Sequence, residues 1–166
     1  DYGMPSASIA APLDVEILIV GSGFSGLGAG IALKKMGFHD FTILERANDL
    51  GGTWRDNTYP GLTVDVASTS YSYGFEPYPE WSRLYAPGAE VKAYADHCAT
   101  KYGVREHIRY GKTVTSARYD DASNTWITRL ADGSELRSRY LVSATGLFGP
   151  PKLPDIPGID GYTGTI

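Results

Sequence analysis

The stretch Val15-Glu16-Ile17-Leu18-Ile19-Val20-Gly21-Ser22-Gly23-Phe24-Ser25-Gly26 decides the fold of this chain. Residues 15–20 form a short apolar run, which is typical of a strand buried on both faces in a parallel sheet. Glycines follow at positions 21, 23 and 26, and a helical pattern runs from about Ser25 to Met36, with Gly37 placed to end it. A second apolar run at 41–44 completes a βαβ unit of about 30 residues.

The three glycines lie between the predicted strand and the predicted helix, and in that context they indicate a dinucleotide-binding turn. Gly21 allows the tight turn, Gly23 lets the backbone approach a pyrophosphate, and Gly26 lets helix and strand pack closely. The N-terminus of the helix offers free N–H groups and a positive dipole end to phosphates. Glu45 follows the second strand and is placed to bind a ribose hydroxyl. An acid there disfavours a 2′-phosphate, so the turn favours FAD or NAD over NADP.

The remaining sequence predicts a loop-rich middle and a last third of β structure. Residues 51–87 are rich in Gly, Pro, Tyr, Ser and Asp. A segment of this length without a period is usually functional or disordered, and its many aromatic residues argue against disorder. A helix is expected from about Ala89 to Tyr102. Asp132-Gly133 is a hairpin signal. The expected strands are an antiparallel meander at 109–119, 125–130 and 135–139, standing on the edge or flank of a parallel sheet, and a further buried strand at 140–146 that joins 15–20 and 41–45 in that sheet.

Length, composition and charge describe an ordinary globular chain. It has 166 residues, of which 42% are hydrophobic and 20% charged, and its net charge is −4. Without clustered Lys and Arg, neither nucleic acid nor an anionic membrane is expected as a partner. Cys98 is the single cysteine, which fits a reducing compartment, and we expect a cytoplasmic location. The expected organisation is a flexible arm at 1–13, a cofactor-binding domain at 14–149 and an exit linker at 150–166.

The residues after Glu45 resemble a known flavoprotein pattern. Gly51-Gly52-Thr53-Trp54 is followed after four residues by Tyr59-Pro60-Gly61 and after three more by Asp65. The Gly-Gly-x-Trp part is similar to class B flavoprotein monooxygenases in general, N-hydroxylating members included. The whole pattern resembles the Baeyer–Villiger branch, and the resemblance extends from about Val15 to Ile166. It implies an α/β fold: a Rossmann-like, glutathione-reductase-type FAD-binding domain with a parallel sheet and a three-stranded antiparallel β-meander.

The resemblance also implies an activity and a set of site residues. The activity is oxygen insertion beside a ketone carbonyl, driven by NADPH and O2, to give an ester or lactone. Asp65 is the implied catalytic residue, because the family uses this acid to hold an arginine that stabilises negative charge on the flavin. The cofactor-binding residues expected from the turn and from the resemblance are Gly21, Ser22, Gly23, Phe24, Ser25, Gly26, Glu45, Arg46, Gly52, Thr53, Trp54, Asp65, Tyr71, Val114, Ala144, Thr145 and Gly146.

Several alternatives stay open from the sequence. Tyr162-Thr163-Gly164 looks like the opening of a later family fingerprint whose histidine would come two residues after Ile166. The chain is therefore expected to be a fragment without the family's NADPH domain and without turnover of its own. A missing C-terminal chain or self-association could complete it. The alternatives are a stand-alone FAD-binding module or swapped dimer, an N-hydroxylating relative, and the NAD-binding domain of a dehydrogenase. The scattered histidines His39, His97 and His107 are expected at the surface, without a chemical role.

Overall fold

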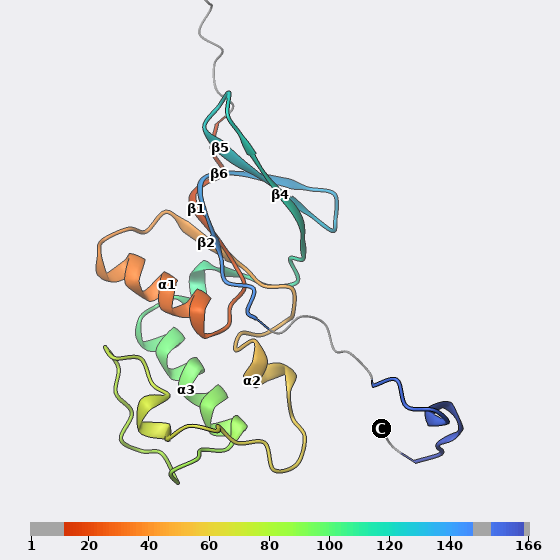
Figure 1. Ribbon diagram of the computed structural model, residues 1–166. Coiled ribbons are helices and arrows are strands. Elements are labelled where there is room, and N and C mark those ends of the chain that lie inside the picture. Colours follow the sequence, from red (N-terminus) through yellow and green to blue (C-terminus); the bar gives the residue numbers. More distant parts are fainter. Residues whose placement is uncertain (1–11, 148–153, 165–166) are drawn as a thin grey trace, which may run out of the picture.

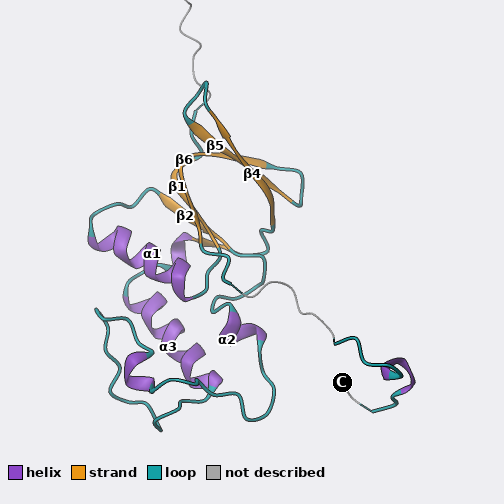
Figure 2. Cartoon of the chain, in the orientation of Figure 1, coloured by secondary structure: helices purple, strands orange, loops and turns teal. Residues whose placement is uncertain are grey.

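The computed structural model describes residues 12–147 and 154–164. Most of the arm expected at 1–13 and part of the linker expected at 150–166 lie outside these residues. Figures 1 and 2 show a sheet with the two longer helices, α1 and α3, on one side of its parallel strands. The helices and strands are β1 (Val15–Val20), α1 (Phe24–Lys35), β2 (Phe41–Leu44), α2 (Thr53–Asp56), α3 (Gly88–Lys101), β3 (Ile108–Arg109), β4 (Val114–Asp120), β5 (Thr125–Leu130) and β6 (Glu135–Ser143). Short 3-10 turns occur at Ser68–Ser70, Arg105–His107 and Ile159–Gly161.

Within the described residues the sheet has six strands in the order β3-β2-β1-β6-β5-β4. Strand β1 pairs in parallel with β2 on one side and with β6 on the other, so that Ile19 lies opposite both Ile43 and Val142. The expected parallel arrangement of these three strands is therefore confirmed. Strands β4, β5 and β6 form the antiparallel meander. Because β6 pairs with both β1 and β5, the meander is a continuation of the parallel sheet.

Two strand boundaries expected from the sequence are wrong. The strands expected at 135–139 and 140–146 are one strand, β6, whose first residues pair with β5 and whose later residues pair with β1. The strand expected at 109–119 is interrupted: Ile108–Arg109 forms β3, parallel to β2, and β4 starts at Val114. The interruption has a physical reason, since Gly111 has a positive φ and the backbone at 111–112 bonds to the turn after β2.

Both faces of β1 are covered. On one face, residues of β1 and β2 pack against Leu27 and Ile31 of α1 and against Tyr94 and Cys98 of α3. On the other face, Val15, Leu18 and Leu44 pack against Leu130 of β5, with Val114 and Leu136 at the border of the cluster. The meander thus curls over the face that the helices leave free. This double burial explains why residues 15–20 form an apolar run that does not alternate.

The end of β6 and His107 differ from expectation. Strand β6 ends at Ser143, and Tyr140 within it is 57% exposed, so residues 140–146 are not a buried strand. Leu141 packs against one core cluster and Val142 and Ala144 against the other, but all three are only partly buried, and Tyr140, Ser143, Thr145 and Gly146 are exposed. His107 is half buried, because its turn lies over β2 and its ring stacks on Phe41 at a centroid distance of 4.0 Å. His39 and His97 are exposed as expected.

The loop-rich middle is fixed to α3 by a buried carboxylate. Glu76, only 9% exposed, accepts hydrogen bonds from Lys101 at 2.7 and 2.8 Å, from Tyr102 at 2.7 Å, and lies 3.1 Å from His97. The bonds from Lys101, Tyr102 and His97 lower the pKa of Glu76 to about 2. The Tyr94 hydroxyl donates to the Glu76 carbonyl at 2.7 Å. The segment expected to be functional is therefore ordered against a helix of the core.

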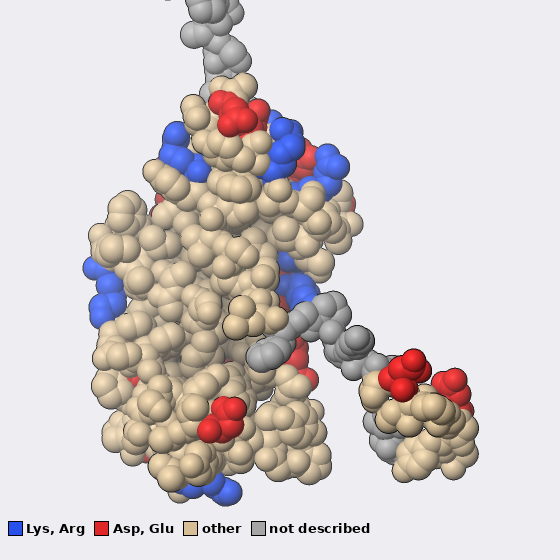
Figure 3. Space-filling view, viewed as in Figure 1, with Lys and Arg blue, Asp and Glu red and all other residues tan. Residues whose placement is uncertain are grey.

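The charged surface is mixed in sign. Figure 3 shows acidic and basic side chains gathered over the meander end of the molecule, whereas fewer charges lie over the helices in this view. Several pair across strands or loops, among them Arg129–Glu135 at 2.7 Å and Arg139–Glu16 at 3.3 Å. In the part of the chain that the structure describes, no helix has the length and apolar character needed to cross a bilayer. The same residues contain no cluster of three or more His, Cys, Asp or Glu side chains suited to a metal ion.

Candidate cofactor site

A cavity of about 560 Å³ opens at the carboxyl ends of β1, β2 and β6. Ligands of open α/β sheets bind in the crevice at this edge. Fifteen residues predicted to bind the cofactor line this single cavity: Gly21, Ser22, Gly23, Phe24, Ser25, Glu45, Arg46, Gly52, Thr53, Trp54, Tyr71, Val114, Ala144, Thr145 and Gly146. The structure thus brings together residues that are more than 120 positions apart in the sequence.

The first glycine turn has no room for side chains on its inner side. Gly21 has φ +102°, and a Cβ atom there would lie 2.5 Å from the carbonyl oxygen of Ala144. At Gly26 a Cβ would lie 1.9 Å from the carbonyl oxygen of Gly21, so Gly26 packs beneath the turn and does not line the cavity. At Gly23 the situation is the reverse: a Cβ would meet only the Cα of Gly52, at 3.7 Å, and would project beside the cavity.

The N-terminus of α1 lies at the cavity, and its first N–H groups have no protein partner among the described residues. Gly23 is the N-cap residue, no side chain in the described part of the chain caps the helix, and its first turn contains no acid. The first N–H groups of a helix have no partner within the helix. An anion in the cavity would therefore meet backbone donors and the positive end of the helix dipole.

A second glycine turn closes against the first. The N–H of Gly51 donates to the carbonyl of Ser22 at 3.0 Å, and a Cβ on Gly52 would lie 3.1 Å from the Cα of Gly23. Both Gly51 and Gly52 have positive φ. On its far side, Gly51 rests on the stem of Lys92, whose ammonium pairs with Asp49 at 2.8 Å. The double glycine is required because two backbones meet here with no space for side chains.

Glu45 is a buried carboxylate in the wall of the cavity, only 4% exposed. One oxygen, Oε2, accepts from the N–H of Ser22 at 3.0 Å and from its hydroxyl at 2.6 Å. The other, Oε1, accepts from the N–H of Ala47 at 3.0 Å and pairs with Arg55 at 3.0 Å. Burial alone would raise the pKa of Glu45, but the hydrogen bonds from Ser22 and Ala47 and the charge of Arg55 outweigh it and lower the pKa. Glu45 is therefore ionised at neutral pH.

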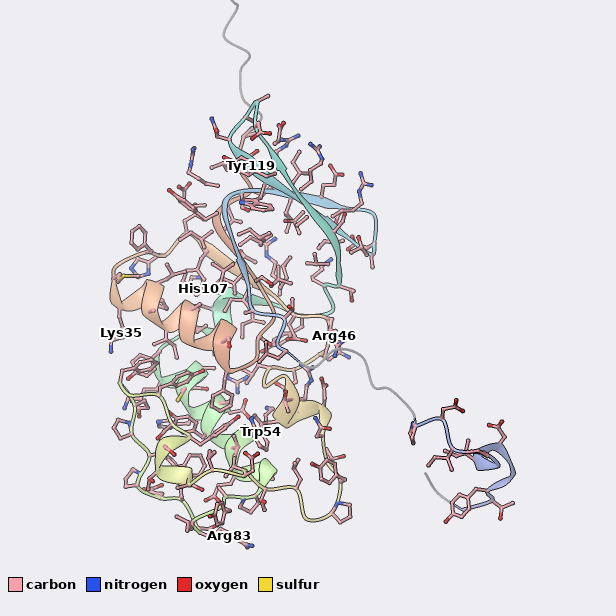
Figure 4. The ribbon with its side chains drawn as sticks, viewed as in Figure 1. Lys35, Arg46, Trp54, Arg83, His107 and Tyr119 are labelled. Atoms are coloured by element: carbon pink, nitrogen blue, oxygen red, sulfur yellow. The ribbon has the colours of Figure 1, made fainter. Side chains whose placement is uncertain are left out.

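Aromatic side chains also line the cavity. The indole N–H of Trp54 donates to the Tyr71 hydroxyl at 3.0 Å, and the two rings meet edge to face with centroids 5.4 Å apart. Phe24 packs on Tyr71 at 5.5 Å. Figure 4 shows Trp54 on α2 and Arg46 at the turn that follows β2. Arg46 is an exposed side chain at the rim, 3.4 Å from Asp56. The cavity thus has a charged side at the end of β2 and an aromatic side at α2.

Asp65 is a predicted site residue that lies outside the cavity, as Gly26 does, but unlike Gly26 it is not part of a turn that forms the cavity wall. It is exposed and does not line the cavity. Several residues of the site were not predicted from the sequence, and two of them are basic. Arg55 is the buried cation that pairs with Glu45, and Lys112 lines the cavity and pairs with Asp132 at 2.8 Å. A signal for Arg55 was present, because a carboxylate predicted at the end of a buried strand requires a partner, and Arg55 is a basic residue within the adjoining motif.

Comparisons with known proteins bear on this site. Residues 19–87 match a family model described as an NAD(P)-binding Rossmann-like domain. Over 152 residues the chain is 43% identical to a Baeyer–Villiger monooxygenase of Streptomyces coelicolor, covering 92% of this chain and 29% of that protein. The chain is homologous to Baeyer–Villiger monooxygenases. It spans about 30% of the length of the curated relatives that it matches.

Solved structures related to Baeyer–Villiger monooxygenases have the same fold. One, described as OTEMO in complex with FAD and NADP, superposes with a TM-score of 0.83 at 32% identity and covers 93% of this chain and 30% of its own. Another, an oxidized steroid monooxygenase bound to NADP, has a TM-score of 0.81 at 36% identity and covers 90% of this chain and 29% of its own. The Rossmann-like fold class and the resemblance to Baeyer–Villiger monooxygenases are thereby confirmed.

Proposed function

We propose that the cavity at the carboxyl ends of β1, β2 and β6 binds FAD. We further propose that the chain is the FAD-binding part of a Baeyer–Villiger monooxygenase, which uses NADPH and O2 to convert a ketone into an ester or lactone. The observation that carries the proposal is the meeting of both glycine turns, Glu45 and Trp54 in one cavity. One of the related solved structures is a complex with FAD and NADP, which supports a flavin in this family.

The described residues suit each part of FAD in turn. The pyrophosphate would lie on the Gly21 turn at the N-terminus of α1, where Gly23 leaves space and the backbone donors are free. The adenosine ribose would lie by Glu45, and the adenine by the backbone at 112–114. Thr53 and Trp54 would line the path toward the flavin ring. When bound, FAD supplies the oxidation–reduction chemistry, while these residues bind it, orient it and exclude water from it.

The roles of Asp65 and of NADPH belong to this proposal as well. Asp65 stands as the candidate catalytic acid; its exposed carboxylate is available to a cationic partner outside the described cavity. Glu45 opposes a 2′-phosphate, so this cavity is assigned to FAD and NADPH is assigned to another site of the enzyme. Since the relatives are about three times longer, we expect FAD binding but no ketone oxidation from these 166 residues alone. The ketone and O2 are the proposed substrates, and the cytoplasm is the proposed location.

A ligand panel separates this function from that of an NAD-binding dehydrogenase domain. The purified, flavin-free chain would be titrated with FAD, FMN, NAD⁺ and NADP⁺ by calorimetry. We expect FAD to bind most tightly, because it alone of the four has both the adenosine diphosphate half and the flavin. FMN should bind poorly, since it has no group for the Glu45 side of the cavity. Preferred binding of NAD⁺ would favour the dehydrogenase alternative and contradict our proposal.

A further inference from the structure

The buried carboxylate of Glu45 has no free hydrogen-bonding position. A carboxylate offers about four lone-pair sites, and four donors fill them: the N–H and hydroxyl of Ser22 on Oε2, and the N–H of Ala47 and the guanidinium of Arg55 on Oε1. A ribose hydroxyl that donates to Glu45 must therefore displace one of these donors. The structure shows which of them can leave.

Three of the four donors are fixed by other contacts. The N–H of Ser22 belongs to the glycine turn, whose carbonyl at Ser22 is bonded by Gly51. The N–H of Ala47 belongs to a turn whose carbonyl is bonded by Gly111 at 3.0 Å. The guanidinium of Arg55 is held by further bonds to Asp56 and to the backbone carbonyl of Asp49.

The fourth donor, the Ser22 hydroxyl, is attached through a single rotatable bond. Among the described residues its one hydrogen-bond partner is Glu45, at 2.6 Å. Ser22 is fully buried, yet it lines the cavity beside Glu45. It is therefore the donor that can move at least cost, by a change of its χ1 rotamer.

We propose that the Ser22 hydroxyl is a placeholder, which satisfies Glu45 in the ligand-free site and is exchanged for a ribose hydroxyl when the nucleotide binds. The inference rests on the proposed function and adds a specific role for Ser22 within it. A buried carboxylate that lacks a donor is costly, so the placeholder stabilises the ligand-free site. Binding then loses one hydrogen bond for each that it gains, which lowers affinity. Only a nucleotide with a ribose hydroxyl can donate to Glu45 the hydrogen bond that the Ser22 hydroxyl gives up.

The test is Ser22→Ala, measured with FAD and with two fragments, ADP and 2′,3′-dideoxy-ADP. In the variant the ribose hydroxyl meets a carboxylate with a vacant position, so FAD and ADP should bind about tenfold more tightly, in line with a hydrogen bond to a charged group. Dideoxy-ADP has no ribose hydroxyl to offer. Its affinity should stay the same, because the Ser22–Glu45 bond survives its binding in the unmodified chain. The ligand-free variant should also unfold at lower temperature.

A second measurement uses the unmodified chain and needs no variant to fold. The ¹³Cβ chemical shift of Ser22 reports its χ1 rotamer, and it should change when ADP is added but not when dideoxy-ADP is added. Equal or weaker binding of FAD by Ser22→Ala, or equal tightening for both fragments, would overturn the placeholder role while FAD binding itself stands. Failure of the unmodified chain to bind FAD at all would refute the proposed function, and this inference with it.

Discussion

Two glycines three positions apart in the same turn should respond in opposite ways to one added methyl group. Gly26→Ala places a Cβ 1.9 Å from the carbonyl oxygen of Gly21. The turn cannot retreat, because the N–H of Gly21 is bonded to Leu44 at 2.8 Å and its inner side already lies against Ala144. Gly23→Ala places a Cβ in ordinary contact, 3.7 Å from Gly52. The first change should damage folding, and the second should damage binding.

The magnitudes follow from these contacts. Overpacking costs about 1–3 kcal/mol, and a clash with backbone belongs at the upper end of that range. Against this cost, alanine in place of glycine in a helix raises the free energy of unfolding by up to about 1 kcal/mol, because alanine has the higher helix propensity. Gly26→Ala should therefore lower the free energy of unfolding by about 2 kcal/mol, or the melting temperature by about 4–8 °C. Gly23→Ala should change stability by no more than about 0.5 kcal/mol, yet weaken FAD binding at least tenfold by blocking the pyrophosphate.

The assay combines thermal unfolding, followed by far-ultraviolet circular dichroism, with titration of FAD into each flavin-free chain. Gly23→Ala serves as the control for Gly26→Ala, because both add the same methyl group to the same turn. The reasoning would be refuted if Gly26→Ala were as stable as the unmodified chain. It would equally be refuted if Gly23→Ala bound FAD with unchanged affinity.

Three further perturbations test other contacts. Glu76→Gln should remove an acid-sensitive contribution to the stability of the fold. Because the pKa of Glu76 is lowered to about 2, its carboxylate stabilises the fold above the pKa of the unfolded state, and this effect is lost as the pH falls toward 2. Acid unfolding curves should therefore show a smaller change in stability over this pH range for the variant than for the unmodified chain. Arg55→Met should raise the pKa of Glu45, so that FAD affinity is lost at a higher pH on acidification than in the unmodified chain. Superimposable pH profiles of FAD affinity for the two chains would count against this coupling. Trp54→Phe removes the bond to Tyr71 and should weaken FAD binding by about threefold to tenfold, with no change expected in ADP affinity.

Local sequence signals were sufficient for the elements that carry the cofactor site. One βαβ unit contains the apolar run at 15–20 and the glycine turn, and Glu45 directly follows its second strand. Their arrangement therefore depends on short-range geometry. The meander was harder to delimit. Strand β6 pairs with β5 through its first residues and with β1 through its last, and no local pattern marks the change of partner. The break before β4 depends on hydrogen bonds to residues more than 60 positions away.

The contacts within the site also divide into those that local sequence predicts and those that depend on the path of the chain. Glycine positions could be predicted because a glycine is needed wherever two backbones meet, as at Gly23 and Gly52. A cationic partner for Glu45 was to be expected, but its identity as Arg55 could not be predicted, because it depends on the direction in which the short helix α2 leaves the second glycine turn. The position of Asp65 outside the cavity likewise depends on the path of a loop without a period. Its proposed role stays a prediction.

The most direct test of the central claim is a two-dimensional amide NMR spectrum of the chain recorded with and without one equivalent of FAD. The claim is that FAD binds in the cavity at the carboxyl ends of β1, β2 and β6. It predicts the largest shifts at the backbone amides of residues 23–25, 51–54, 112–114 and 144–147, which come from four separate segments of the cavity lining. Shifts confined to the meander or to the exposed face of α3, or a spectrum unchanged by FAD, would contradict it.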